Sequence, residues 1–375
     1  MTTEPAGKER LAFFLPGLYG GGAERIMLNL ASGIASRGYP MDLVLARAEG
    51  SFLDEVPNSV RLIDLKATRV LSSTPALVHY LRHERPAALL SILHANITAL
   101  WARPLAGTPL RVILAEHNTL SSVVRGGTDP RWHLYPKLAR WFYPWADGII
   151  AVSEGVAVDL AELTRIPRER IQVIYNPIIS PVLFEKSMET LDHPWFKSGE
   201  PPVLLAVGRL TKQKAFDVLI RAFIEVRKNR PARLMILGEG EERTTLEGLI
   251  REYNLEKDII LPGFIPNPYP YMAHAAAFVL SSRWEGLPTV LVEAMALGAR
   301  IISTDCPSGP REILLDGKYG QLVPVEDPFA LASAIVASLA TVGIRPSQES
   351  WKSYELDCVV DQYINMLFGN NPCEK

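Results

Sequence analysis

The stretch from Leu11 to Glu24, LAFFLPGLYGGGAE, decides the fold of the first half of the chain. Its five apolar residues, Leu11–Leu15, predict a strand buried on both faces, and a helix is expected directly after the glycines. Glycine lets the backbone approach a ligand closely, and the start of a helix offers free N–H groups and a partial positive charge. This loop is therefore a candidate phosphate site, and a tight turn without a ligand is the alternative.

The same strand–loop–helix pattern continues along the whole chain. Short aliphatic runs alternate with helix-length segments, which is typical of parallel strands covered by helices on both sides. The fold class is α/β, with two successive doubly wound parallel sheets. The predicted strands are Leu11–Leu15, Met41–Leu45, Val60–Leu65, Ala88–Ile92, Val112–Ala115, Gly148–Val152, Ile171–Ile174, Val203–Val207, Leu234–Leu237, Ile259–Leu261, Ala276–Leu280, Ile301–Ser303 and Gln321–Val323.

A proline-rich stretch between Asn176 and Pro202 divides the two sheets. Prolines at this density end helices and strands, so the linker is placed at 181–201, between domains 1–180 and 202–350. The last segment, Trp351–Phe368, has apolar residues at helical spacing and predicts a helix within 351–375.

Composition excludes several classes of protein. The chain has 375 residues, 48% hydrophobic and 21% charged, as expected for a globular protein of two domains. A net charge of −2 argues against nucleic-acid binding, and three scattered cysteines predict neither disulfides nor a zinc site. The polar N-terminus lacks the apolar core of a signal peptide and no run of 18 apolar residues occurs, so a cytoplasmic location is expected.

Two further motifs carry chemistry. GRLTKQK, Gly208–Lys214, follows the first strand of the second domain, where Arg209 and Lys214 suit a diphosphate. EGLPTVLVEAMALG, Glu285–Gly298, places Glu285 on a loop and Glu293 on the following helix, so both can face one ligand. The amides near Thr289 and Val290 would face a phosphate. Two solvated surface cations and a chance pair of glutamates are the alternatives.

In order and spacing these three motifs resemble those of the retaining GT-B glycosyltransferases of family 4, across essentially the whole chain. The resemblance implies two Rossmann-like domains facing across a cleft, with the active site between them and the last helix crossing back to the first domain. It implies transfer of a hexose or N-acetylhexosamine from a nucleotide sugar, expected to be a UDP sugar. It also implies that no cofactor or metal is needed, because the Arg209–Lys214 pair would stabilise the leaving diphosphate.

The resemblance also assigns roles to single residues. His117, in AEHNT after a strand, would lie close to the sugar, although a lone histidine after a strand is more often structural. Glu285 would bind the transferred sugar and Glu293 the ribose. The expected catalytic residues are His117, Arg209, Lys214 and Glu285, and the expected substrate-binding residues are Gly21, Gly22, Gly286, Leu287, Thr289, Val290 and Glu293.

The segment TDCPSGPREIL, Thr304–Leu314, together with EHNT, resembles the N-acetylgalactosamine transferases that extend polyprenyl-diphosphate-linked oligosaccharides. A lipid-linked glycan acceptor and a role in assembling cell-surface polysaccharide or glycoprotein glycans follow from this resemblance.

A basic and aromatic patch supports the same acceptor. Six basic residues and two acids lie between Arg103 and Arg140, and an aromatic cluster follows up to Trp145. Such a surface suits an anionic membrane or the diphosphate of a lipid-linked acceptor, which adds a peripheral location on the inner face of the cytoplasmic membrane. A buried aromatic helix with solvated charges is the alternative. The expected contact residues are Arg125, Arg131, Lys137 and Arg140.

Three rival functions are alternatives to this interpretation. A UDP-sugar epimerase on the same fold would need additional acid and base carboxylates, and a non-catalytic nucleotide-sugar-binding protein would be expected to have lost Glu285, Lys214 or His117. A dehydrogenase is disfavoured because Leu45-Ala46-Arg47 places no acidic residue at the end of the second strand.

Overall fold

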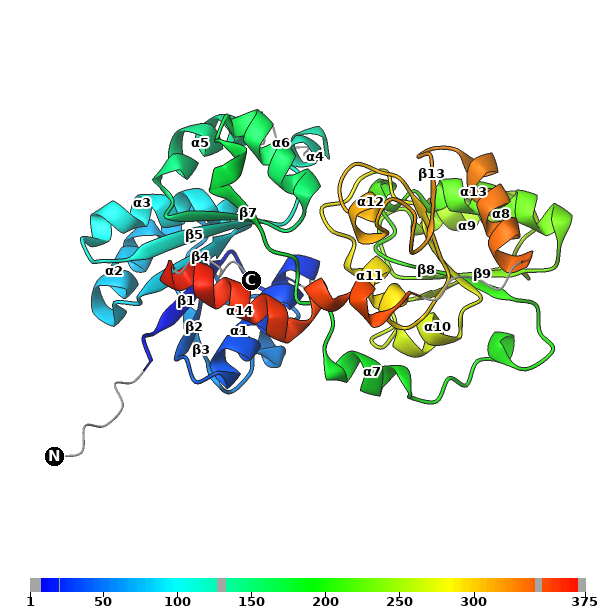
Figure 1. Cartoon of the computed structure of the whole chain (residues 1–375), viewed down its shortest axis with the longest axis horizontal. Helices are drawn as coiled ribbons and strands as arrows, with labels where there is room; N and C mark the ends of the chain where they lie inside the picture. The colour runs from blue at the N-terminus through cyan, green and yellow to red at the C-terminus, as the bar shows by residue number, and fades with distance from the viewer. Residues whose placement is uncertain (1–7, 20, 127–132, 341–345, 370–375) are drawn as a thin grey trace. The chain divides into compact units, whose positions relative to one another are not determined.

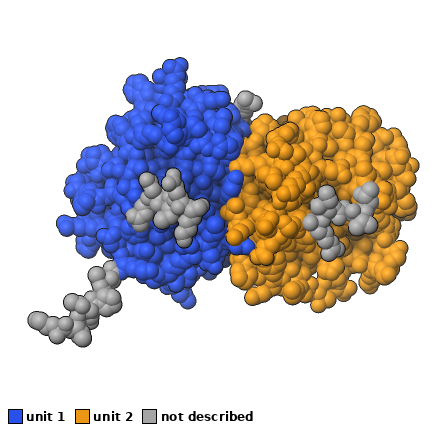
Figure 2. Space-filling view, viewed as in Figure 1, with its two compact units in different colours: residues 1–177, 355–375 blue, residues 178–354 orange. Residues whose placement is uncertain are grey.

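The structure is a computed structural model of the whole chain and describes residues 8–19, 21–126, 133–340 and 346–369. It divides into two compact units, coloured separately in Figure 2. Unit 1 comprises the described parts of Met1–Pro177 and Glu355–Lys375, and unit 2 comprises those of Ile178–Tyr354. Each unit contains one parallel sheet with helices on both faces, which confirms the predicted α/β class (Figure 1).

The sheet of unit 1 has the strand order β3-β2-β1-β4-β5-β6-β7, with every pair parallel. Helix α1 packs against α14 on one face, and α2 packs against α3 on the other. The strands are β1 Leu11–Leu15, β2 Met41–Leu45, β3 Val60–Asp64, β4 Ala88–Ile92, β5 Arg111–Glu116, β6 Gly148–Ala151 and β7 Ile171–Val173. The helices are α1 Gly22–Ser36, α2 Thr74–Glu84, α3 Asn96–Ala106, α4 Leu120–Gly126, α5 Tyr135–Phe142, α6 Glu154–Thr164 and α14 Leu356–Phe368.

The sheet of unit 2 has the order β10-β9-β8-β11-β12-β13, again parallel throughout. Its core is formed by the faces of α8, α9 and α13 that cover one side of the sheet. The strands are β8 Val203–Val207, β9 Arg233–Leu237, β10 Ile259–Gly263, β11 Ala277–Leu280, β12 Ile301–Thr304 and β13 Gln321–Val323. The helices are α7 Pro181–Ser187, α8 Phe216–Asn229, α9 Arg243–Glu252, α10 Tyr269–His274, α11 Thr289–Ala296, α12 Pro310–Ile313 and α13 Pro328–Ala340.

The last helix begins five residues later than the sequence suggested, at Leu356 instead of Trp351. Residues Lys352–Tyr354 form a separate 3₁₀ turn, and the carbonyl of Tyr354 accepts hydrogen bonds from the amides of Ile178 and Ile179 instead of from the next turn of an α-helix. From Leu356 onward the helix packs into the core of unit 1, and the missing side chain of Gly33 allows this, because a Cβ at that position would lie 2.6 Å from Cγ2 of Val360.

The proline-rich stretch contains more structure than a linker. Residues 181–201 include α7, which begins with Pro181 and packs against α10, and they are grouped with unit 2. Proline is well tolerated at the first position of a helix, where its missing N–H would have no partner. The division between the units therefore falls at Pro177, before this segment.

Candidate functional site

Two loops of unit 2 meet at the carboxyl edge of its sheet. One follows β8 and the other follows β11, and these strands pair directly although they are far apart in the sequence. The strand order reverses at this pair, which is the point where open α/β sheets bind their ligands. The predicted motifs Gly208–Lys214 and Glu285–Gly298 are thus adjacent in space.

Lys214 and Glu285 are in direct contact. Nζ of Lys214 lies 2.6 Å from Oε1 of Glu285, and the hydroxyl of Ser282 donates to the same oxygen at 2.6 Å. Nε2 of Gln213 lies 3.4 Å from the other oxygen, Oε2. Glu285 is only 6% exposed, so these donors keep a buried carboxylate oriented toward the loop that carries Lys214.

Glycines make this close packing possible. A Cβ on Gly208 would lie 3.1 Å from Cε of Lys214, and a Cβ on Gly238 would lie 1.9 Å from the carbonyl oxygen of Gly208. Gly238 also has φ +145°, which other residues rarely adopt. A side chain at Gly238 would therefore push the β8 loop away, whereas one at Gly208 would displace the side chain of Lys214.

Arg209 differs from Lys214, because no described residue binds its side chain. Its side chain is exposed and makes no hydrogen bond or ion pair with the residues that the structure describes. Helix α11, in the loop region after β11, begins at Thr289, one residue later than a start at Pro288, and the first amides of a helix have no acceptor within it. A free guanidinium and free amides at this edge are suited to an anion.

Glu293 lies on α11 and is partly buried. Burial of its carboxyl raises the pKa to about 7, although a hydrogen bond from the Tyr269 hydroxyl, 3.5 Å away, opposes this shift. Gly286 and Leu287 are buried, and the hydroxyl of Ser308 donates to the carbonyl of Gly286 at 2.7 Å. The predicted substrate residues of this motif therefore form one ordered segment.

In unit 1 the glycine-rich loop leads into α1. Gly21 and Gly22 are both exposed, and the amide of Gly21 donates to Oε2 of Glu24 at 2.5 Å. Glu24 thus caps the helix from which it projects, as in a capping box. This carboxylate uses one of the free amides that the sequence suggested for a phosphate.

His117 lies just after β5 and is buried, with 7% of its surface exposed. Burial lowers the pKa of its ring to about 4, so the ring is neutral at neutral pH. Neither ring nitrogen has a hydrogen-bond partner among the described residues. Buried polar atoms without a partner are rare, and the position of this ring at the carboxyl end of a strand makes it a candidate ligand contact.

The residue before it, Glu116, is held in a buried network. Asn96 Nδ2 donates to Glu116 Oε1 at 2.9 Å, and the hydroxyl of Tyr143 donates to the same oxygen. Tyr135 joins through a 3.0 Å contact between the two tyrosine hydroxyls. Burial raises the pKa of Glu116 to about 7, against the lowering effect of its Tyr143 and Asn96 hydrogen bonds.

The network fixes α5, which carries part of the basic and aromatic patch. Lys137 and Arg140 are exposed, and so are Trp141 and Trp145, at 74% and 51%. Arg131 and the side chain of Arg125 lie outside the described residues. The patch is therefore a mixed surface of cations and tryptophans over buried tyrosines.

Four supporting residues were missed by the sequence analysis. Gln213, Ser282 and Arg283 belong to the motifs or flank them, but nothing in one sequence distinguishes them from their neighbours. Glu116 was quoted only as a neighbour of His117. An acidic residue at the end of an otherwise apolar strand was the available signal.

Comparisons with known proteins identify the family of the chain. Residues 20–179 match the model of Glycosyltransferase Family 4, and residues 187–354 match that of Glycosyl transferases group 1. The first match lies in unit 1 except for its last two residues, and the second lies in unit 2. The chain is thus a glycosyltransferase that combines a Glycosyltransferase Family 4 domain with a Glycosyl transferases group 1 domain.

Two relatives come from Campylobacter jejuni. One, named N-acetylgalactosamine-N,N'-diacetylbacillosaminyl-diphospho-undecaprenol 4-alpha-N-acetylgalactosaminyltransferase, is 29% identical over 91% of this chain and 93% of its own length. The other, named as an alpha-1,4-N-acetyl-D-galactosaminyltransferase of a diphospho-undecaprenol-linked glycan, is 23% identical over 96% of this chain and 98% of its own length.

Solved structures show the same fold. The lipopolysaccharide outer core galactosyltransferase WaaB has a TM-score of 0.74 at 20% identity, over 96% of this chain and all of that one. Anabaena HepE in complex with UDP and glucose has a TM-score of 0.77 at 18% identity, with the same coverage. At these identities the likeness concerns the fold alone. Within the described ranges, no helix has both the length and the apolar character that a membrane span requires.

Proposed function

We propose that this glycosyltransferase moves a hexose or N-acetylhexosamine from a UDP sugar to a polyprenyl-diphosphate-linked glycan, with retention of configuration and without a metal. The observation that carries the proposal is the Lys214–Glu285 pair beside the unpartnered Arg209 at the carboxyl edge of unit 2. The lipid-linked acceptor is supported by the names of the two Campylobacter jejuni relatives, and UDP by the ligand of Anabaena HepE.

In this proposal the cations stabilise the leaving group. Negative charge accumulates on the departing UDP as the anomeric C–O bond breaks, and donors fixed in advance stabilise it without reorganising. Arg209 can grip two phosphate oxygens, while Lys214 supplies a point charge beside Glu285. These side chains would stabilise the charge that a metal ion stabilises in other enzymes. We therefore expect sugar transfer to continue when a chelator is present.

The sugar is assigned to Glu285 and the neutral ring of His117, and the ribose to Glu293. The acceptor hydroxyl would attack from the face that the leaving group occupies, with the departing phosphate oxygen as the base. A neutral His117 orients sugar hydroxyls by hydrogen bonds and cannot supply a proton at neutral pH, because the pKa of its ring is about 4.

The test is release of nucleoside diphosphate from a panel of UDP, GDP and ADP sugars in EDTA. Each donor is supplied with and without a polyprenyl-diphosphate-linked sugar, and the anomeric configuration of the product is read by NMR. Release that requires the acceptor, from one donor, supports the proposal. Interconversion of the donor sugar would identify an epimerase instead, donor binding without turnover a binding protein, and activity only after adding a divalent cation would overturn the metal-independent mechanism.

We also propose that the exposed face of α5 and the turn after it contacts an anionic bilayer on the cytoplasmic side. Trp141 and Trp145 are exposed next to Lys137 and Arg140, and this combination of tryptophan with basic residues suits the interface of anionic lipids. The test is co-sedimentation with phosphatidylglycerol vesicles.

Trp141→Ala combined with Lys137→Ala should weaken vesicle binding about tenfold, whereas Phe329→Ala, an equally exposed aromatic of unit 2, should not. Unchanged binding in the double variant would overturn the assignment. Normal vesicle binding with a raised KM for the lipid-linked acceptor would assign the patch to the acceptor instead.

A further inference from the structure

Three successive carbonyls of the turn Lys212–Lys214 are held by the segment that follows β11. The hydroxyl of Ser281 donates to the carbonyl of Lys214 at 2.7 Å, and the backbone amide of Arg283 donates to that of Gln213 at 2.8 Å. Nη1 of Arg283 donates to the third carbonyl, that of Lys212. The turn that presents Lys214 is therefore fixed along its whole length.

The guanidinium of Arg283 also binds two carboxylates on other segments. Its Nη2 lies 3.2 Å from both oxygens of Asp217, in the first turn of α8, and 3.3 Å from Oε2 of Glu326. Its Nε donates to Oε1 of Glu326, which follows β13. One planar side chain thus joins three segments, which a lysine with its single nitrogen cannot do.

The turn needs this support because it is short and ends in an unfavourable conformation. Ala215, directly after Lys214, has φ +49°, in the left-handed region that alanine rarely occupies. A chain released from Arg283 could relax at this residue, and Nζ of Lys214 would move away from Glu285. Displacements of about 1 Å at a catalytic group can cost about 100-fold in rate.

We propose that Arg283 is a positioning residue for the donor site: it holds the turn Lys212–Lys214 so that the ammonium group of Lys214 faces the departing diphosphate. This inference rests on the proposed function and deepens it. In this proposal Arg283 acts through Lys214, because its guanidinium is bound to the carbonyl of Lys212 and to the carboxylates of Asp217 and Glu326. Its effect on the rate should therefore disappear when Lys214 is absent, and that dependence separates positioning from general stabilisation.

The experiment is a double-mutant cycle of Arg283→Gln and Lys214→Ala in the full chain. Arg283→Gln alone should lower kcat 10- to 100-fold with less than a threefold change in donor KM, and Arg283→Lys should recover only part of the loss. In the Lys214→Ala background the same substitution should change kcat less than twofold. Arg227→Gln, which breaks a comparable ion pair with Asp258 elsewhere in unit 2, is the matched control and should leave kcat unchanged.

The same cycle on the Kd of UDP, measured by calorimetry, tests the inference without turnover. Arg283→Gln should raise the Kd about 3- to 10-fold in the wild-type background and less than twofold in Lys214→Ala. Equal losses in both backgrounds, or an equal loss from Arg227→Gln, would overturn the positioning role while leaving the proposed function intact. Full activity of Arg283→Gln beside an active wild type would also overturn the positioning role and leave the proposed function intact. A wild type that neither transfers sugar nor binds UDP would overturn both the positioning role and the proposed function.

Discussion

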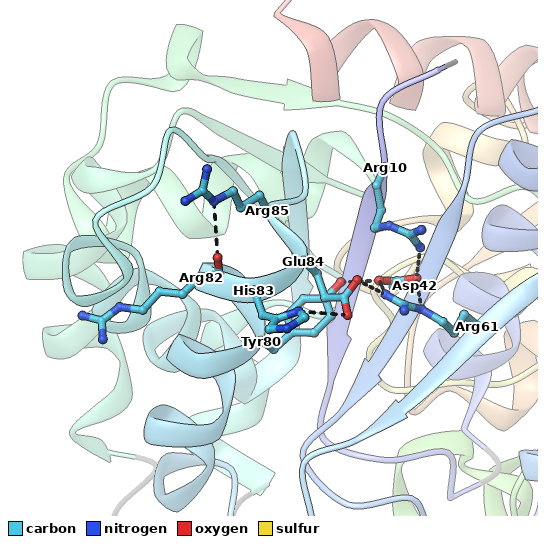
Figure 3. Close-up of polar contacts among 8 residues, drawn as sticks. All are labelled: Arg10, Asp42, Arg61, Tyr80, Arg82, His83, Glu84 and Arg85. Carbon is cyan, nitrogen blue, oxygen red and sulfur yellow. Dashed lines mark hydrogen bonds and ion pairs between the residues drawn. The ribbon is translucent and has the colours of Figure 1, made fainter. Parts of the chain in front are cut away.

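Asp42 in unit 1 and Glu285 in unit 2 are both buried carboxylates paired with cations, yet they lie at opposite edges of their sheets. Asp42 is near the start of β2, whereas Glu285 follows the end of β11. Asp42 is completely buried and accepts from Arg10 at 2.6 Å, from Arg61 at 2.6 and 2.9 Å and from the Tyr80 hydroxyl at 2.7 Å (Figure 3).

The Asp42 cluster is closed. Arg61 also binds Glu84, so two arginines face two carboxylates. Burial alone would raise the pKa of Asp42, but the hydrogen bonds from Arg61 and Tyr80, with the charges of both arginines, lower it overall. Such a network can stabilise the fold, but it leaves no cation for a ligand.

The Glu285 cluster is open. Lys214 is bound to Glu285, while Arg209 in the same loop remains without a partner in the described part of the chain. Similar ion pairs therefore serve different purposes at the amino and the carboxyl ends of parallel strands. Ligands bind at the carboxyl ends of parallel strands, where helix N-termini also point.

The largest effect should come from Lys214→Ala. We expect kcat/KM to fall about 10²–10³-fold, because one fixed donor to the leaving group is lost. The free energy of unfolding should fall by only about 1–2 kcal/mol, since Ser282 and Gln213 still donate to Glu285. Lys212→Ala, an exposed neighbour, is the control. A loss of activity below fivefold would remove Lys214 from the catalytic group.

Asp42→Ala should show the opposite pattern. We expect a loss of about 2–3 kcal/mol in urea unfolding, below the usual cost of breaking a buried pair because Arg10 and Arg61 are 32% and 42% exposed. The rate per folded molecule should not change. Asp357→Ala, which breaks an exposed pair with Arg37, should cost less than about 0.5 kcal/mol. A fall in kcat for Asp42→Ala would end the distinction between the two clusters.

His117 differs from Asp42 and Glu285, because it is a buried titratable group that carries no charge at neutral pH. The folded protein takes up its proton only near pH 4, whereas the unfolded chain does so near 6.5, so stability is lost as the pH falls between these values. From pH 7 to pH 5 the wild type should lose about 2 kcal/mol more than His117→Gln. Urea unfolding at both pH values measures this, with the exposed His79→Gln as control. Parallel losses in wild type and His117→Gln would mean that the ring is protonated in the folded state.

The smallest effect concerns Glu293. Glu293→Gln should raise the donor KM about tenfold, the usual worth of a hydrogen bond to a charged group. Because the pKa of Glu293 is about 7, the wild-type KM should rise as the pH falls from 8 to 6, and that of Glu293→Gln should not. Tyr269→Phe removes a long hydrogen bond to Glu293, of 3.5 Å, and should change the KM less than threefold. A wild-type KM independent of pH would argue against ribose binding by this carboxylate.

The local pattern of apolar residues was sufficient to predict where the strands lie. Every predicted strand is present within two residues, because runs such as Val203–Val207 are apolar on both faces and are bounded by glycine, proline or polar residues. The last helix shows where local periodicity fails. Its first predicted turn is a separate 3₁₀ turn, Lys352–Tyr354, and the carbonyl of Tyr354 accepts hydrogen bonds from the amides of Ile178 and Ile179, which are distant in sequence.

The sequence by itself determined the α/β class, the family and the residue types at the donor loops, because these depend on short-range periodicity and on motifs. Only the tertiary structure decided which side chains meet. Pairing of β8 with β11 brings Lys214 to Glu285 across 71 residues, and it reveals Ser281 and Arg283 as the residues that hold the lysine's turn. It also closed the Asp42 cluster and left Arg209 open, because burial and partner geometry arise only when the strands lie side by side.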